Sequence, residues 1–263
     1  MSRIIGIVSG KGGVGKTVTT ANLGAAMSRY FDKRVIAVDT NLTTPHLGIQ
    51  LGMYPFDVSL NDVLKSSKTI EEALYEHNSS GMKAVLSSLI LGDIAGVRVD
   101  TIRKNIEELT EYADIILLDS APGLGKEGLI TLKSCNELII IVNPNIPSVT
   151  DAFKLIKLAK QMGKNILGIV VNRVGESKYE LKPKEIEKIA QIPVIATIPE
   201  DKNVPKSIAK KSPVVLMNNN SPASKGFLSL CEEILGEGYY PPKQDIFSRL
   251  LGFFRNGLWK FRR

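Results

Sequence analysis

The chain has 263 residues, of which 43% are hydrophobic and 23% charged, a composition typical of a folded protein with a large core. Its two cysteines, Cys135 and Cys231, show no CxxC spacing, which argues against a disulfide framework and against a compact zinc or iron–sulfur site. No apolar run approaches the roughly 20 residues that span a bilayer, and the glycine-interrupted start predicts no secretory signal.

The net charge of +7 is unevenly distributed along the chain. Residues 243–263 carry six basic residues against one acid, a net +5, so the other 242 residues carry only +2. A body that binds DNA is expected to spread its positive charge over one face of the globule. The charge distribution therefore argues against nucleic acid as a partner.

Short segments rich in β-branched residues recur along the chain, and most are nearly continuous in apolar character. Strands buried on both faces of a parallel sheet have this pattern. The segments are residues 3–9, 34–39, 82–88, 114–119, 137–142, 166–172 and 193–199. Segments with helical character lie between most of them, at 18–30, 100–112, 149–163 and 182–190. This alternation predicts an α/β fold with a doubly wound, mainly parallel sheet.

A glycine-rich stretch, SGKGGVGKT at residues 9–17, follows the first predicted strand and opens the first predicted helix. From Gly10 to Thr17 it matches G-x-x-x-x-G-K-[ST], whose backbone N–H groups curl around phosphate oxygens beside a helix N-terminus. The pattern predicts that Lys16 reaches the β- and γ-phosphates of a nucleotide and that the Thr17 hydroxyl binds Mg²⁺. The predicted phosphate-binding residues are Gly10, Lys11, Gly12, Gly13, Val14, Gly15, Lys16, Thr17 and Val18.

The additional lysine in this loop, Lys11, makes the stretch similar to the deviant Walker A box of the MinD/ParA family of P-loop NTPases. The resemblance extends over roughly residues 2–235. It implies an ATPase whose two subunits sandwich two nucleotides, with Lys11 crossing to the partner's phosphates and Lys16 acting in its own subunit. A lysine supplied in this way contacts the γ-phosphate only in a closed dimer. Dimerisation would therefore depend on which nucleotide is bound. The alternative is that Lys11 is a solvated loop lysine.

Two motifs at strand ends extend the resemblance. Asp39 in VDTN and Asp119 in LLDSAPG match the carboxylates beside Mg²⁺, and residues 120–125 match the segment that senses the γ-phosphate. Asn41 stands where the family has a second carboxylate that positions or activates the attacking water. A neutral amide cannot act as a general base but can orient water. We therefore predict ATP binding with slow hydrolysis, and abolished hydrolysis stays open.

Two further strand ends are expected to hold the adenine, because the resemblance places adenine contacts there. An NKxD-type aspartate for guanine is missing, which favours ATP over GTP. The matched residues are Asn172, Arg173, Pro199, Glu200 and Asp201, although Asp201 could instead cap the next helix. His46 and His77 are isolated in the sequence and are expected to be loop or surface residues without a metal role.

The end of the chain, DIFSRLLGFFRNGLWKFRR (245–263), follows a Gly- and Pro-containing stretch at 236–244 that predicts a linker. At 100° per residue, its large apolar side chains fall within an arc of about 160°, flanked by cations, with only Trp259 on the polar side. This pattern favours an in-plane membrane helix; packing on the protein's own core or on a partner is the alternative. The membrane-facing residues would be Ile246, Phe247, Leu250, Leu251, Phe253, Phe254, Leu258 and Phe261.

The sequence thus predicts an ATPase domain at 1–235, a linker at 236–244 and a membrane-targeting helix at 245–263. Such a tail moves the resemblance toward the MinD members of the family. It implies an ATP- and Mg²⁺-dependent homodimer that cycles between the cytoplasm and an anionic membrane surface, positions division or other machinery, and has an unidentified protein activator. The alternatives are an ATP-gated membrane adaptor with little hydrolysis and a ParA-like DNA partition ATPase.

Overall fold

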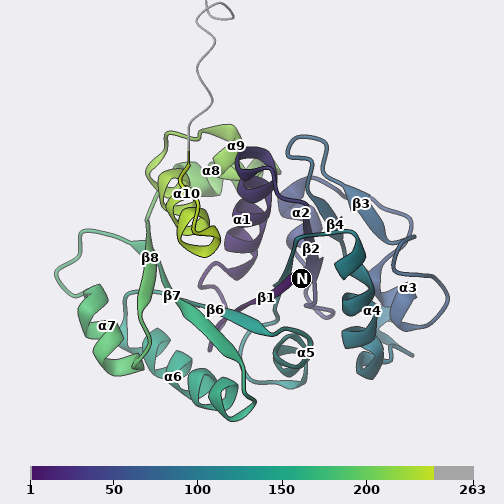
Figure 1. Cartoon of the computed structure of the whole chain (residues 1–263), viewed down its shortest axis with the longest axis horizontal. Coiled ribbons are helices and arrows are strands. Elements are labelled where there is room, and N and C mark those ends of the chain that lie inside the picture. Colours follow the sequence, from purple (N-terminus) through teal and green to yellow (C-terminus); the bar gives the residue numbers. More distant parts are fainter. Residues whose placement is uncertain (1, 240–263) are drawn as a thin grey trace, which may run out of the picture.

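A single sheet organises the structure, a computed structural model that describes residues 2–239. The strand order is β3-β4-β2-β5-β1-β6-β7-β8, and every pairing is parallel except that of β3 with β4 (Figure 1). The strands are β1 (Arg3–Val8), β2 (Val35–Asp39), β3 (Leu74–Glu76), β4 (Lys83–Val85), β5 (Ile115–Asp119), β6 (Glu137–Val142), β7 (Asn165–Val174) and β8 (Val194–Pro199).

Helices cover both faces of the sheet. One face carries α1 (Lys16–Phe31), α2 (Leu47–Leu51), α8 (Asn203–Ala209), α9 (Val214–Met217) and α10 (Pro222–Leu235). The other carries α3 (Leu60–Leu64), α4 (Ile102–Glu108), α5 (Lys126–Ser134), α6 (Ile146–Gln161) and α7 (Pro183–Ala190). Three 3-10 turns accompany them, at Leu91–Ile94, Val99–Thr101 and Leu109–Glu111.

The core consists of two apolar layers separated by the sheet. Successive side chains of β1 alternate between them, so that Ile4 and Val8 pack in one layer and Ile5 and Ile7 in the other. Every residue of β2 and β5 is buried, because helices cover both faces. The continuous apolar runs of the sequence therefore produce the doubly wound architecture, and the carboxyl ends of the central strands meet at one edge.

The seven predicted strands and four predicted helical segments are all present. The sequence did not reveal β3, a three-residue antiparallel edge strand that is only half-buried and so has no apolar run. His77 lies in a loop as expected but is buried, not at the surface, and its Nδ1 lies 2.7 Å from the Ser80 hydroxyl. Within residues 2–239 no helix has the length and apolar character needed to cross a bilayer. The predicted helix at 245–263 lies outside the described residues.

Candidate nucleotide-binding site

The predicted phosphate loop connects β1 to α1 at the carboxyl edge of the sheet. Gly13 (φ 75°) and Gly15 (φ 101°), which is the N-cap of α1, adopt left-handed conformations that favour glycine. At Gly10 the reason for glycine is space, since a Cβ would lie 2.3 Å from the backbone carbonyl carbon of Asp151 in α6. The glycines thus provide both the turn and the close packing that direct the loop's backbone toward the start of α1.

A cavity of about 370 Å³ lies over this loop, within the size range of small-ligand sites. It brings together predicted site residues that are far apart in the sequence, from the loop to Asn41 and Arg173. Residues that the sequence reasoning did not assign complete the wall. The lining residues are Gly12, Gly13, Gly15, Lys16, Thr17, Val18, Asn41, Thr44, His46, Gln50, Ser120, Pro122, Arg173 and Ile208.

Two carboxylates lie side by side beneath the loop. Asp39 and Asp119 end the neighbouring strands β2 and β5 in register, and each is only 1% exposed. Burial and the charge of Asp119 raise the pKa of Asp39, although the backbone N–H groups of Leu47 and Asn41 donate to its carboxylate at 3.0 and 3.1 Å. Burial raises the pKa of Asp119 to about 6, against the opposing effects of Thr17 and Lys16. Two adjacent buried carboxylates resist simultaneous ionisation unless a cation joins them.

The loop lysine Lys16 extends into the same buried region. Its ammonium donates to the Ser9 hydroxyl at 3.0 Å, and that hydroxyl donates to the Lys11 carbonyl at 2.6 Å. Burial lowers the pKa of Lys16, with Asp119 acting in the opposite direction. Lys11 itself is half-buried, and within residues 2–239 its ammonium forms no ion pair. Ser9 therefore holds Lys16 in place, a role for which the sequence offered no signal beyond its position before the loop.

The donor set fits a hard divalent cation and phosphate oxygens. Thr17, Asp39 and Asp119 supply hydroxyl and carboxylate oxygens, which are the ligands that Mg²⁺ prefers. Within the described residues the buried Ser120 hydroxyl has no hydrogen-bond partner, so it is available to an oxygen of a ligand. Residues 2–239 contain no group of three or more His, Cys, Asp or Glu side chains that could hold a metal ion by themselves. A cation here would therefore rely on water and phosphate for its remaining ligands.

Asn41 occupies the cavity wall with its amide engaged locally. Its Nδ2 donates to the Thr44 carbonyl at 2.6 Å, and its Oδ1 accepts from the Thr44 backbone N–H at 3.2 Å. The adjacent Thr43 hydroxyl donates to Glu127 near the start of α5. The segment after β2 is thus tied to the start of α5, and in this conformation both polar atoms of the Asn41 amide are engaged by Thr44.

The predicted adenine residues separate into two groups. Arg173, with φ 58°, lines the cavity, and the neighbouring Asn172 donates from Nδ2 to the Val14 carbonyl of the phosphate loop at 2.7 Å. Pro199 and Glu200 do not line the cavity. The Asp201 carboxylate accepts from the backbone N–H groups of residues 203 and 223, which are at the starts of α8 and α10. The capping alternative for Asp201 is therefore the observed arrangement; its adenine role stays a prediction.

Comparison with known proteins places this site in a family. The sequence profile of the CobQ/CobB/MinD/ParA nucleotide binding domain matches residues 5–214. The chain belongs to this family. A relative that is 35% identical over 259 residues, covering 98% of this chain and 97% of its own length, is an uncharacterized ATP-binding protein of Methanocaldococcus jannaschii.

Solved MinD structures share the fold of this family member. The cell division ATPase MinD of Pyrococcus furiosus superposes with a TM-score of 0.87 at 34% identity, over 90% of this chain and 99% of that one. The septum site-determining protein MinD of Pyrococcus horikoshii, complexed with Mg-ADP, gives a TM-score of 0.86 at 32% identity, over 89% and 96% of the two chains. The MinD/ParA resemblance and the P-loop NTPase fold predicted from the motifs are thereby confirmed.

Proposed function

We propose that this MinD/ParA family member is an ATP-dependent dimerising ATPase that binds the inner membrane surface reversibly and positions division or other cellular machinery. The observation that carries the proposal is the placement of Lys16 and the buried Asp39–Asp119 pair beneath the 370 Å³ cavity over the phosphate loop. A buried carboxylate pair beside a buried lysine is poorly stable by itself and is relieved when a cation and phosphates bind.

Nucleotide binding follows from the loop's own groups. The first backbone N–H groups of α1 are unpaired within the helix, and their positive dipole end favours phosphate oxygens. Lys16 would leave Ser9 and contact the β- and γ-phosphates. Mg²⁺, held by Thr17 and the carboxylates of Asp39 and Asp119, would neutralise phosphate charge. The full ionisation of both carboxylates would then be favourable, because the cation lowers their pKa values.

The rate of hydrolysis would depend on whether the Asn41 amide can hydrogen-bond to the attacking water and position it. Its amide must exchange at least one of its bonds with Thr44 before it can hold a water in the cavity. Since an amide positions water without removing its proton, we expect slow turnover. The bridge between Thr43 and Glu127 would couple this exchange to the segment after β5, which would report the γ-phosphate.

The membrane part of the proposal rests on the sequence of residues 245–263. Each basic residue at an anionic surface contributes about 1 kcal/mol, and partial burial of each large apolar side chain contributes about 1 kcal/mol. Ordering the short helix costs about 1–2 kcal/mol per residue, so one tail alone binds modestly. Two tails on one dimer would bind up to about 10²–10⁴ times more tightly. ATP-driven dimerisation would thereby recruit the protein from the cytoplasm to the membrane.

A second candidate function is an ATP-gated membrane adaptor with little hydrolysis. Two observations favour it. Position 41 has an amide in place of a carboxylate, and this amide is hydrogen-bonded to Thr44, so it does not position a water for attack in this conformation. A protein partner that releases Asn41 from Thr44 would convert the adaptor into an ATPase, so both candidates leave room for an activating partner. DNA partition, the third possibility from the sequence, gains no support from a body with a charge of only +2.

Light scattering of the full chain with ATP, ADP or no nucleotide, followed by phosphate release, tests the catalytic part of the proposal. We expect a dimer with ATP and Mg²⁺, a monomer with ADP, and slow phosphate release from the dimer. A chain that binds ATP as a monomer and never dimerises would contradict the assembly switch. A stable ATP dimer that releases no phosphate would select the adaptor.

A further inference from the structure

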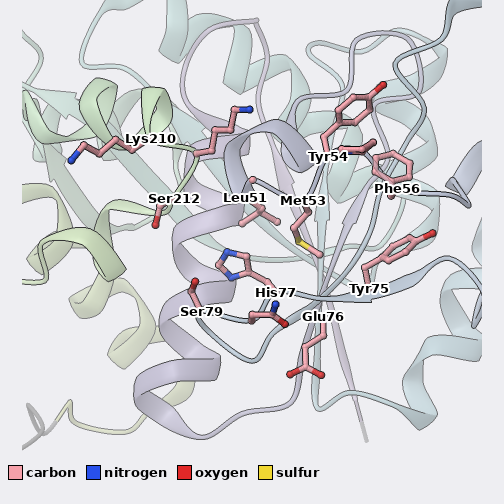
Figure 2. Close-up of a pocket in the computed structure, with 14 residues that line it drawn as sticks. Leu51, Met53, Tyr54, Phe56, Tyr75, Glu76, His77, Ser79, Lys210 and Ser212 are labelled. Atoms are coloured by element: carbon pink, nitrogen blue, oxygen red, sulfur yellow. The ribbon is translucent and has the colours of Figure 1, made fainter.

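A second hollow lies on the sheet face that carries α1 and α2. It has a volume of about 620 Å³, and Figure 2 shows Lys210 and Ser212 on one side of it and the aromatic rings of Tyr54, Phe56 and Tyr75 on the other. An adjoining hollow of about 560 Å³ shares Ser79 and Ser212 with the first and adds Arg29, Tyr30, Leu216, Met217 and Asn219. We call the two hollows together the basic groove.

Positive charge dominates the basic groove. Arg29, Lys210 and Lys211 are exposed, and within residues 2–239 none of them forms an ion pair. Glu76 is the one acid among the described residues that line it. His77 adds no charge at neutral pH, because burial lowers its pKa. The groove is therefore lined by three basic residues that have no ion-pair partner among the described residues.

The opposite wall is aromatic and firmly packed. The rings of Tyr54 and Phe56 stack edge to face with centroids 5.6 Å apart, and Phe56 contacts Tyr75 at 5.9 Å. Tyr75 is itself held, since its hydroxyl accepts a hydrogen bond from the Val58 backbone N–H at 2.7 Å. Tyr54 remains 48% exposed. A rigid wall with an exposed tyrosine at its rim suits the boundary between lipid headgroups and acyl chains, where amphipathic rings accumulate.

The last described residue lies beside the basic groove, and this position indicates which ligand the groove would meet. The described chain ends at Tyr239, whose ring lies 5.6 Å from the ring of Tyr30 and 5.9 Å from that of Phe31. Tyr30 lines the basic groove, and its hydroxyl donates to the Val215 carbonyl. The six residues that follow Tyr239, up to Asp245, reach at most about 22 Å even when fully extended. A membrane that holds the tail must therefore lie close to this face of the body.

We propose that the basic groove binds the headgroup of an anionic phospholipid, as a second membrane contact made by the folded body beside the tail. This inference rests on the membrane binding proposed above. Arg29, Lys210 and Lys211 would receive the lipid phosphate, and the ring of Tyr54 would lie at the interface. An acidic protein segment would satisfy the same charges, but only the membrane is brought to the groove by the chain's own connectivity.

The groove also shares its walls with the nucleotide site. In the segment around α2, His46 and Gln50 line the nucleotide cavity, while Leu51 and Gly52 line the basic groove. The same division occurs at the end of α8, where Ile208 lines the nucleotide cavity and Lys210 and Lys211, just after the helix, line the groove.

The two walls touch, since a Cβ on Gly52 would lie 2.8 Å from the Lys211 carbonyl oxygen. A nucleotide-dependent shift of either wall would therefore reshape the groove. Its affinity for lipid would then depend on the nucleotide as well.

Charge reversal in the full chain tests the groove. The double variant K210E/K211E is compared with K184E/K188E, which makes the same charge change on exposed lysines of α7, on the opposite face of the sheet. Vesicles of phosphatidylcholine, with or without phosphatidylglycerol, are sedimented in the presence of ATP. We expect the groove variant to lose at least about tenfold in affinity for the anionic vesicles and the α7 variant to change by less than about twofold.

Each other outcome overturns the inference in a recognisable way. An equal loss in both variants would show a general charge effect without a groove. If the groove variant pellets as well as the wild type, membrane binding by the tail would stand, but the proposed lipid contact of the groove would be excluded. Failure of the wild type to pellet would remove the proposed membrane function and this inference together.

A fluorescence measurement locates the contact directly. Trp259→Phe removes the chain's only tryptophan, and Tyr54→Trp then places a reporter at the rim of the groove. A matched control carries Ile189→Trp, a 42% exposed position on α7. Vesicles that contain brominated lipids should quench the groove reporter and spare the control. A groove reporter that stays unquenched while the protein pellets would overturn the inference and leave an acidic protein segment as the occupant to seek.

Discussion

Asp39 and Asp119 end adjacent strands in register, and both carboxylates are buried beneath the phosphate loop. Their burial raises both pKa values, that of Asp119 to about 6. The folded protein without metal therefore binds more protons than the unfolded chain between about pH 4 and about pH 6. The free energy of unfolding should fall as the pH rises through this window, because the unfolded carboxylates ionise freely and the folded ones do not.

This relationship predicts the effect of Asp119→Asn on stability. In the presence of a chelator near pH 7, the variant should be more stable than the wild type by on the order of 1–3 kcal/mol, since a buried charge is removed. Added Mg²⁺ with nucleotide should reverse the order by stabilising only the wild type. Urea unfolding across the pH range measures both effects. A variant less stable than the wild type in the chelator would contradict the unfavourable carboxylate pair.

Asn41→Asp should restore the missing carboxylate. The aspartate can no longer donate to the Thr44 carbonyl, so the segment after β2 loosens while a base becomes available to the water. We expect the single-turnover rate of ATP cleavage to rise by about 10²-fold. Quenched-flow measurement of phosphate formation gives this rate, with Asn41→Ala as the control. Unchanged cleavage in Asn41→Asp would show that position 41 does not act on the water.

The two loop lysines should have separable effects. Lys16→Ala should lower nucleotide affinity by at least about 100-fold, since it removes the buried cation of the subunit's own site. Lys11→Ala should leave nucleotide binding within about threefold of the wild type and abolish dimerisation with ATP, if Lys11 contacts the phosphate of the other subunit as proposed. Calorimetry gives the affinities and light scattering the assembly state. If Lys11→Ala dimerises normally with ATP, the alternative that Lys11 is a solvated loop lysine would be favoured.

Asn172 links the predicted base contact to the phosphate loop. Asn172→Asp places a carboxylate oxygen against the Val14 carbonyl that the amide now contacts at 2.7 Å, so ATP affinity should fall by about tenfold or more. If the Asn172 amide also hydrogen-bonds to adenine, Asn172→Ala should prefer ATP over GTP less strongly than the wild type does. Competition binding with ATP and GTP measures the ratio. Equal losses for both nucleotides would assign Asn172 to loop positioning alone.

The cysteines should be unreactive in the folded protein. Burial raises the pKa of Cys135 to about 11, and burial raises that of Cys231 as well. Since the thiolate is the reacting species, a disulfide reagent near pH 8 should label neither thiol in the native state and both after unfolding. Rapid native labelling of Cys231 would contradict the packing of α10 against the sheet, and rapid labelling of Cys135 would contradict the burial of the turn between α5 and β6.

The sequence predicted the parts of the fold that depend on continuous local signals. The apolar runs predict buried strands, and the motif from Gly10 to Thr17 predicts a loop that connects a strand to a helix; the structure has both, with a cavity over the loop. The roles of Thr44 and Ile208 in the cavity wall could not be predicted, because only the packing of α2 and α8 brings these segments to the loop. The hydrogen bond from Lys16 to Ser9 likewise depends on a side-chain conformation that no spacing encodes.

The prediction for residues 245–263 carries the central claim, and vesicle sedimentation tests it most directly. The full chain and a chain truncated before Asp245 are sedimented with anionic vesicles in ATP or ADP. We expect pelleting of the full chain with ATP, little pelleting with ADP, and a large loss on truncation. Equal pelleting of the full chain with ATP and ADP would contradict a nucleotide-gated membrane switch.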